Sequence, residues 1–143
     1  MHDPVARVIG AAHGGWRGAL GGVVEATIGQ MVALGAECSR VRAAIGPRIG
    51  PQSYEVGPEF RETYLADDPG NSRWFIPARR EGHFFFDLAS YLAHRLARSG
   101  VVRAEITDHD TVTEEDQFFS YRRACLHGER AYGRGLSAIA LAE

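Results

Sequence analysis

A short run near the start of the chain combines a metal-capable imidazole, a fixed cation and three glycines. The run is HGGWRG, residues 13–18. His13 could ligate a metal ion, and Arg17 could hold a phosphate or carboxylate through two parallel hydrogen bonds. Glycines let the backbone approach a ligand closely, and a helix start offers unpaired N–H groups to an anion. The run predicts a ligand site. The alternative is a tight turn in which Trp16 packs in the core and His13 is merely hydrogen-bonded.

The flanking elements would place this run between a strand and a helix. Residues 5–12 are apolar and β-branched enough for a short buried strand. Residues 19–34 put Val24, Ile28 and Met31 on one helical face, so a helix is expected there. The site would therefore sit where a strand ends and a helix begins.

Later segments continue the alternation of strands and helices. Asp87 is a natural N-cap for a helix that runs to Gly100. Together the patterns predict an α/β fold, a mixed β-sheet layered with helices, in one domain over residues 1–143. The other expected elements are strands at 41–45, 74–76, 84–86, 101–106, 118–121 and 136–141, a helix at 58–65, and loops at 66–73 and 108–115.

Two further segments carry residues suited to binding. Around Arg48, the run IGPRIGP (residues 45–51) fixes a loop that exposes backbone N–H groups and one guanidinium, so Arg48 could contact a ligand or be solvated on a rigid turn. Tyr54, in the following SYEVG, could stack on or hydrogen-bond to a base, or belong to the core.

The third segment is FFSYRR, residues 118–123. Adjacent arginines after an aromatic strand point in different directions, so either Arg122 or Arg123 could face a pocket while the other pairs on the surface. Together with Arg17, one of them would supply the planar forks that phosphate oxygens accept. The alternative is a surface ion pair with Glu114 or Glu115.

In this order and spacing, the three segments resemble the YfiH-like laccase-domain family, also called the multicopper polyphenol oxidoreductase laccase family. The resemblance runs from about Val5 to the C-terminus, and it departs from the family pattern at Arg48 and Asp110, where a cysteine is usual. Family members are about twice this length, and an upstream half carries further metal ligands. The chain is therefore expected to be the C-terminal portion of a member, with a fold incomplete at its N-terminus.

The resemblance implies a zinc-dependent purine nucleoside phosphorylase. It would convert adenosine, inosine and methylthioadenosine to free base and sugar 1-phosphate, with adenosine deamination as a second activity. His13 matches one member of the family's metal site, so it is assigned as metal ligand and, with Arg17, as catalytic. Arg17, Arg48, Tyr54, Arg122 and Arg123 are assigned to substrate and phosphate. The remaining zinc ligands are expected in the missing upstream segment.

Two alternatives stay open. A catalytically inactive fragment or interaction domain would need its missing half to fold, or would form a homodimer through the sheet edge left at residues 5–12. A copper-dependent polyphenol oxidase would need clustered imidazoles and a thiolate, and the chain has no His-x-His pair, so copper is not expected.

The composition of the chain limits the classes of partner that it is expected to bind. With 16 basic and 18 acidic side chains the net charge is −2, so no basic field favours nucleic acid. No run of 18 apolar residues predicts a membrane span, and two isolated cysteines, Cys38 and Cys125, fit a reducing compartment. We expect a cytoplasmic protein whose partners are a purine nucleoside and phosphate.

Overall fold

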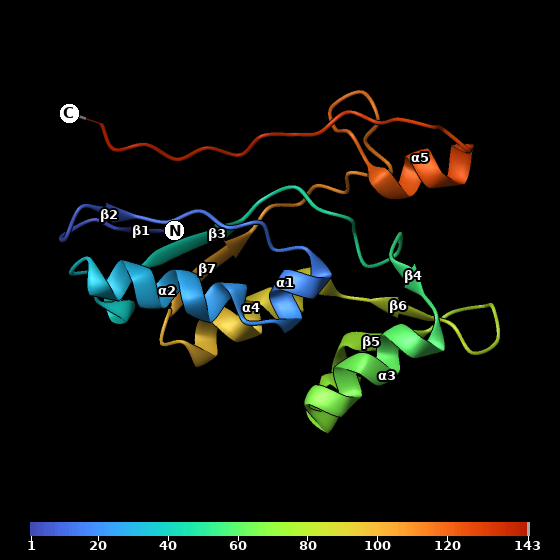
Figure 1. The fold of residues 1–143 in the computed structure, drawn as a ribbon, viewed down its shortest axis with the longest axis horizontal. Coiled ribbons are helices and arrows are strands. Elements are labelled where there is room, and N and C mark those ends of the chain that lie inside the picture. Colours follow the sequence, from blue (N-terminus) through green and yellow to red (C-terminus); the bar gives the residue numbers. More distant parts are fainter. Residues whose placement is uncertain (143) are drawn as a thin grey trace. The chain divides into compact units, whose positions relative to one another are not determined.

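The computed structural model describes residues 1–142, which form two compact units (Figure 1). The first unit comprises Met1–Gly46, Ser90–Thr107 and the residues from Ser137 onward, and the second comprises Pro47–Ala89 and Asp108–Leu136. Both contain helices and strands, so the predicted α/β class with a mixed sheet is confirmed. The expectation of one domain over residues 1–143 stays a prediction. No helix within residues 1–142 is long and apolar enough to cross a membrane.

The first unit is built on a four-stranded sheet in the order β2-β1-β3-β7. Strands β3 and β7 pair in parallel, and the other two contacts are antiparallel. Along β3, Ala43 and Ile45 are buried while Arg42 and Ala44 are exposed, so one face of this strand belongs to the core. The strands are β1 (His2–Asp3), β2 (Val8–Ile9), β3 (Arg42–Ile45) and β7 (Arg103–Ile106).

The helices of this unit are α1 (Trp16–Leu20), α2 (Val23–Ala33), α4 (Leu88–Arg98) and the 3-10 turn η1 (Cys38–Arg40). One continuous helix was expected over residues 19–34, but Gly21 and Gly22 divide it, and Gly22 has a φ of 86° that side chains rarely adopt. An ion pair between Arg95 and Glu25 joins α4 to α2, and Arg95 also donates to the Tyr91 hydroxyl (2.6 Å).

A buried carboxylate, Asp3, ties the first strand to η1. Its side chain is fully buried and accepts hydrogen bonds from the backbone N–H groups of Val5, Ala6 and Glu37 and from the guanidinium of Arg40. Burial alone would raise the pKa of Asp3, but these backbone donors and Arg40 outweigh it and hold the pKa well below its usual range.

The stability that Asp3 contributes is expected to depend on pH. Because its pKa is lower in the folded than in the unfolded chain, the contribution is full at neutral pH and is lost as the pH falls below about 4. Asp3→Asn should lower the urea midpoint at pH 7, and the gap to the wild type should narrow at pH 3. Asp116→Asn, a change at an exposed carboxylate, serves as the control. A gap that stays constant with pH would contradict this account.

The second unit is organised around an aromatic cluster. The rings of Phe86 and Tyr64 lie 4.7 Å apart, those of Phe86 and Phe75 lie 4.8 Å apart, and Phe60 stacks on Tyr64. The cluster packs between helix α3 and a three-stranded antiparallel sheet in the order β4-β6-β5. The elements are β4 (Glu55–Val56), α3 (Pro58–Asp67), η2 (Pro69–Trp74), β5 (Phe75–Pro77), β6 (Phe84–Phe86) and α5 (Tyr121–His127).

Three sequence-based expectations in the chain's loops and C-terminal part are wrong. The expected loop at 66–73 is largely the 3-10 helix η2, in which Asp68 accepts from the Gly70 N–H and the buried Asn71 donates to the Tyr64 carbonyl. The expected strand at 118–121 is instead the approach to helix α5. Residues 136–141, expected as a closing strand, pair with no strand of the described chain, and Leu136 is 92% exposed.

Candidate functional site

The run at residues 13–18 is the turn that leads into helix α1, in the first unit. Gly14 lies against α4 so closely that a Cβ there would come within 2.9 Å of Leu92 Cδ1. A Cβ on Gly15 would lie 2.7 Å from His13 Nε2. These glycines therefore allow the turn to pack on α4 and the imidazole to lie over the backbone, so the glycines have a structural role whether or not a ligand binds.

His13 and Arg17 are both exposed on this turn. The guanidinium of Arg17 stacks on the ring of Trp16, with its carbon 4.4 Å from the ring centroid, and no described residue forms a hydrogen bond or ion pair with it. The imidazole of His13 likewise has no hydrogen-bond partner within the described residues. The turn thus carries one guanidinium and one imidazole that form no hydrogen bond with the described residues, and both are available to a ligand.

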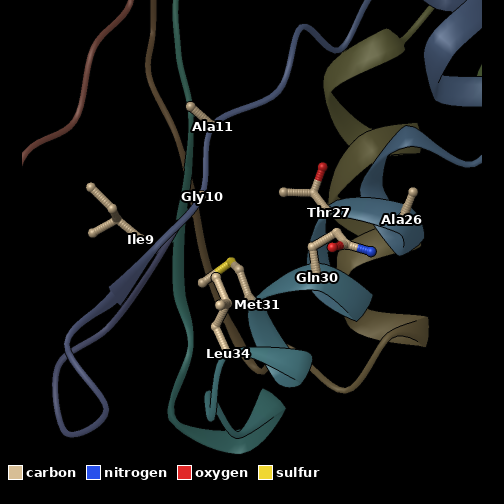
Figure 2. A pocket seen from close by; sticks show the side chains of 8 residues that line it. All are labelled: Ile9, Gly10, Ala11, Ala26, Thr27, Gln30, Met31 and Leu34. Carbon is tan, nitrogen blue, oxygen red and sulfur yellow. The ribbon is translucent and has the colours of Figure 1, made fainter.

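A hollow in the same unit does not include these side chains. It has a volume of about 330 Å³ and lies between the chain that follows β2 and helix α2 (Figure 2). Its lining has no ionisable side chain, so it is not suited to phosphate. The lining residues are Ile9, Gly10, Ala11, Ala26, Thr27, Gln30, Met31 and Leu34.

The other predicted binding residues lie in the second unit. Arg48 and Asp110 form an isolated parallel bridge, and Arg48 Nη1 donates to the carbonyl oxygen of His109 (3.0 Å). Ser53 Oγ donates to Asp110 Oδ2 (2.5 Å). Arg48 is thus not solvated on a rigid turn, as one of the two sequence interpretations had it, but joins two loops of the second unit.

Asp110 stays ionised at this junction. Burial would raise its pKa, but hydrogen bonds from Ser53, Gly50 and Val112, together with the charge of Arg48, lower it. A Cβ on Gly50 would lie 2.5 Å from Asp110 Oδ2, so only glycine leaves room for this carboxylate. Both departures from the family pattern, Arg48 and Asp110, therefore lie opposite each other in one isolated backbone bridge.

Tyr54 and Arg122 are brought together. Arg122 lies over the Tyr54 ring, with its guanidinium carbon 5.4 Å from the centroid, and Arg122 Nη1 donates to the Glu55 carbonyl oxygen (2.8 Å). Tyr54 is buried and its ring meets Phe60 and Phe86 edge-on. The core interpretation of Tyr54 thus describes its surroundings, with Phe60 and Phe86 edge-on and Arg122 over the ring.

The guanidinium of Arg123 forms hydrogen bonds with backbone carbonyl oxygens. Its Nη1 donates to the carbonyl oxygens of Thr111 (2.6 Å) and Val112 (3.1 Å), and its Nη2 donates to that of Phe118 (2.6 Å). The expected surface pair with Glu115 is present only at 3.9 Å. Arg122 and Arg123 point in different directions, as expected, but they lie on helix α5 rather than on a strand. Ser120 caps the start of this helix, because its Oγ accepts a hydrogen bond from the Arg123 N–H.

Sequence reasoning missed the partner of His109. The side chain that meets this histidine is Glu114, whose Oε2 lies 2.8 Å from Nδ1 of His109. The sequence signal that could have indicated this pair is the five-residue spacing of His109 and Glu114 in a polar segment, because a tight turn can bring two such residues together.

Comparison with known proteins places this fold and these residues in one family. The chain belongs to the multi-copper polyphenol oxidoreductase laccase family, whose model matches residues 1–142. It is 35% identical over 136 residues to a purine nucleoside phosphorylase of Rickettsia prowazekii, covering 94% of this chain and 55% of that protein. It is 40% identical over 123 residues to a purine nucleoside phosphorylase of Deinococcus radiodurans, covering 86% of this chain and 46% of that protein.

Solved structures show the same relationship. The chain matches protein NMB0706 of Neisseria meningitidis with a TM-score of 0.76 and 34% identity, over 85% of this chain and 49% of that one. It matches the hypothetical protein YfiH of Bacillus licheniformis with a TM-score of 0.76 and 28% identity, over 85% and 47%. The chain spans about half the length of the curated relatives it matches.

Proposed function

We propose that this chain is part of a purine nucleoside phosphorylase that transfers the sugar of adenosine, inosine or methylthioadenosine from the base to phosphate. The observation that carries the proposal is the pair of exposed, unengaged side chains, His13 and Arg17, on a glycine turn of a chain whose relatives are named purine nucleoside phosphorylases. Adenosine deamination is proposed as a second activity.

Arg17 fits the needs of phosphorolysis. In that reaction a phosphate oxygen forms a bond to C1′ of the sugar as the C1′–N9 bond breaks and the base leaves. The phosphate must be held against the sugar, and a guanidinium does this with two parallel hydrogen bonds. Arg17 can turn from the Trp16 ring to a phosphate at little cost, because the protein forms no hydrogen bond or ion pair with it inside the described chain.

The described residues of this chain supply only part of the ligand set that a zinc ion needs. A catalytic zinc site takes three protein ligands and a water molecule, and within residues 1–142 no group of three His, Cys, Asp or Glu side chains is arranged to hold a metal ion. On this proposal His13 supplies one ligand, and the others would come from residues beyond this chain or from a second copy. No step is therefore assigned to zinc here.

Zinc content tests this assignment of His13. The purified 143-residue chain is expected to retain well below one equivalent of zinc after dialysis, measured by elemental analysis. The full-length product of the same gene is expected to retain about one equivalent. His13→Ala should reduce the zinc content of the full-length product, whereas His127→Ala, at an exposed histidine of helix α5, should not. Full zinc occupancy in the His13→Ala variant would show that His13 is not a ligand.

The proposed activity is tested by phosphate-dependent release of adenine from adenosine, with added zinc, in this chain and in the full-length gene product. Activity that requires phosphate in the full-length product supports the proposal. Inactivity of both would overturn it and would favour a non-catalytic interaction protein. Release of base without phosphate would indicate hydrolysis instead.

A further inference from the structure

The guanidinium of Arg17, the group to which the proposed function assigns phosphate, lies over the ring of its neighbour Trp16. The guanidinium carbon is 4.4 Å from the ring centroid. Consecutive residues of an α-helix project about 100° apart, so their side chains do not ordinarily face each other. The contact forms because the two side chains fold toward each other, and their spacing in the sequence alone would not produce it.

The backbone that carries this pair is held on both sides within the first unit. Before it, Gly14 packs against Leu92 of helix α4, where a Cβ would come within 2.9 Å of Leu92 Cδ1. After it, the Gly21 N–H donates to the carbonyl oxygen of Arg17 (2.8 Å), and Ala19 is fully buried. The main chain at Arg17 is therefore fixed by packing and by a hydrogen bond. What remains to be set is the direction of the Arg17 side chain.

The Trp16 ring restricts this direction without using the hydrogen-bonding groups of Arg17. A guanidinium carries five N–H donors, and a contact with an aromatic ring gives none of them an oxygen acceptor. No described residue accepts a hydrogen bond from the Arg17 side chain, which is exposed, whereas Trp16 is half-buried. The ring thus offers a partly buried surface to a cation whose donors all stay available.

We propose that Trp16 is the positioning residue for phosphate binding, because its ring keeps the Arg17 guanidinium on this turn before phosphate arrives. This inference rests on the proposed phosphorylase function, in which Arg17 binds phosphate. An exposed arginine samples many rotamers, and ordering it on binding lowers the affinity for the ligand. Contact with Trp16 confines the side chain to a few rotamers in the free protein, from which the guanidinium reaches phosphate by a short movement. Tryptophan suits this role, since it forms the strongest cation–π contacts of the aromatic residues.

The test compares KM for phosphate with kcat in phosphate-dependent cleavage of adenosine by the full-length gene product. Trp16→Leu should raise the KM for phosphate by about 2–10-fold, the affinity usually lost when one rotamer-rich side chain must be ordered on binding. The value of kcat should stay near that of the wild type, because Trp16 does not touch the reacting atoms. Trp16→Phe, which retains a ring, should restore most of the affinity for phosphate. An unchanged KM for phosphate in Trp16→Leu would overturn the proposal, and a lower one would show that the ring competes with phosphate.

A double variant separates positioning from an effect on the fold. In the Arg17→Ala background there is no guanidinium to position, so Trp16→Leu should cause no further rise in the KM for phosphate. A further rise of the same size would show that Trp16 acts through the fold and would overturn the proposal.

Tyr132→Leu is the matched control, since the Tyr132 ring lies under another exposed arginine, Arg134, whose guanidinium carbon is 4.9 Å from the ring centroid. This change should leave both KM and kcat near their wild-type values. An active wild type whose KM for phosphate does not respond to Trp16→Leu would overturn the role of Trp16 alone. A wild type without phosphate-dependent cleavage would overturn the phosphorylase proposal, and the role of Trp16 with it.

Discussion

Arg17→Ala is expected to lower phosphate-dependent cleavage of adenosine in the full-length gene product by about 10²–10³-fold in kcat/KM, which is the usual loss when one preorganised charge-stabilising donor is removed. The physical reason is that the exposed guanidinium of Arg17 stacks on the Trp16 ring and forms no hydrogen bond or ion pair with residues 1–142, so its hydrogen-bonding capacity is available to phosphate. For the same reason, the midpoint of urea unfolding should change little.

Arg98→Ala is the matched control, because Arg98 is an exposed arginine at the end of helix α4 in the same unit. Its removal changes the net charge equally but should not affect turnover. Arg17→Lys should restore only part of the activity, since an ammonium cannot form the two parallel bonds of a guanidinium. If Arg17→Ala and Arg98→Ala behave alike, the loss reflects net charge and Arg17 does not bind phosphate.

The α/β class and most elements of the fold could be predicted from the sequence, because periodicity and capping are local signals. The strand at 41–45 and the helix after Asp87 were placed within a residue or two of their observed bounds. Two of the errors arose where a side chain overrides the local pattern. Asn71 stabilises a 3-10 turn by reaching the Tyr64 carbonyl, and Ser120 begins a helix where aromatic residues favoured a strand.

The candidate site was predicted in outline but not in its pairings. Residue type showed that Arg17 and His13 could bind a ligand, and both lie exposed on one turn. Residue type could not show that Arg123 is engaged by three carbonyls, because backbone acceptors leave no trace in the sequence. Nor could it show that Glu114, rather than Asp108 or Asp110, meets His109, since that depends on how the turn closes.

Arg123→Ala is expected to lower the free energy of unfolding by about 2–4 kcal/mol, because it leaves three backbone carbonyls without their charged donor. The Arg123 side chain is only 15% exposed, so water replaces these bonds poorly. Arg122→Ala is the comparison, since Arg122 makes one such bond and one ring contact, and a loss of about 1 kcal/mol is expected. Urea unfolding of both variants, followed by circular dichroism, provides the measurement.

The same variant decides between two roles for Arg123. If Arg123 bound phosphate, as one sequence interpretation required, Arg123→Ala would raise the KM for phosphate and leave stability unchanged. If it instead holds the turn formed by residues 111–118, stability falls while the KM for phosphate stays near that of the wild type. Arg123→Lys should not rescue stability, because one ammonium cannot reach the carbonyls of Thr111, Val112 and Phe118 with the geometry of the guanidinium fork.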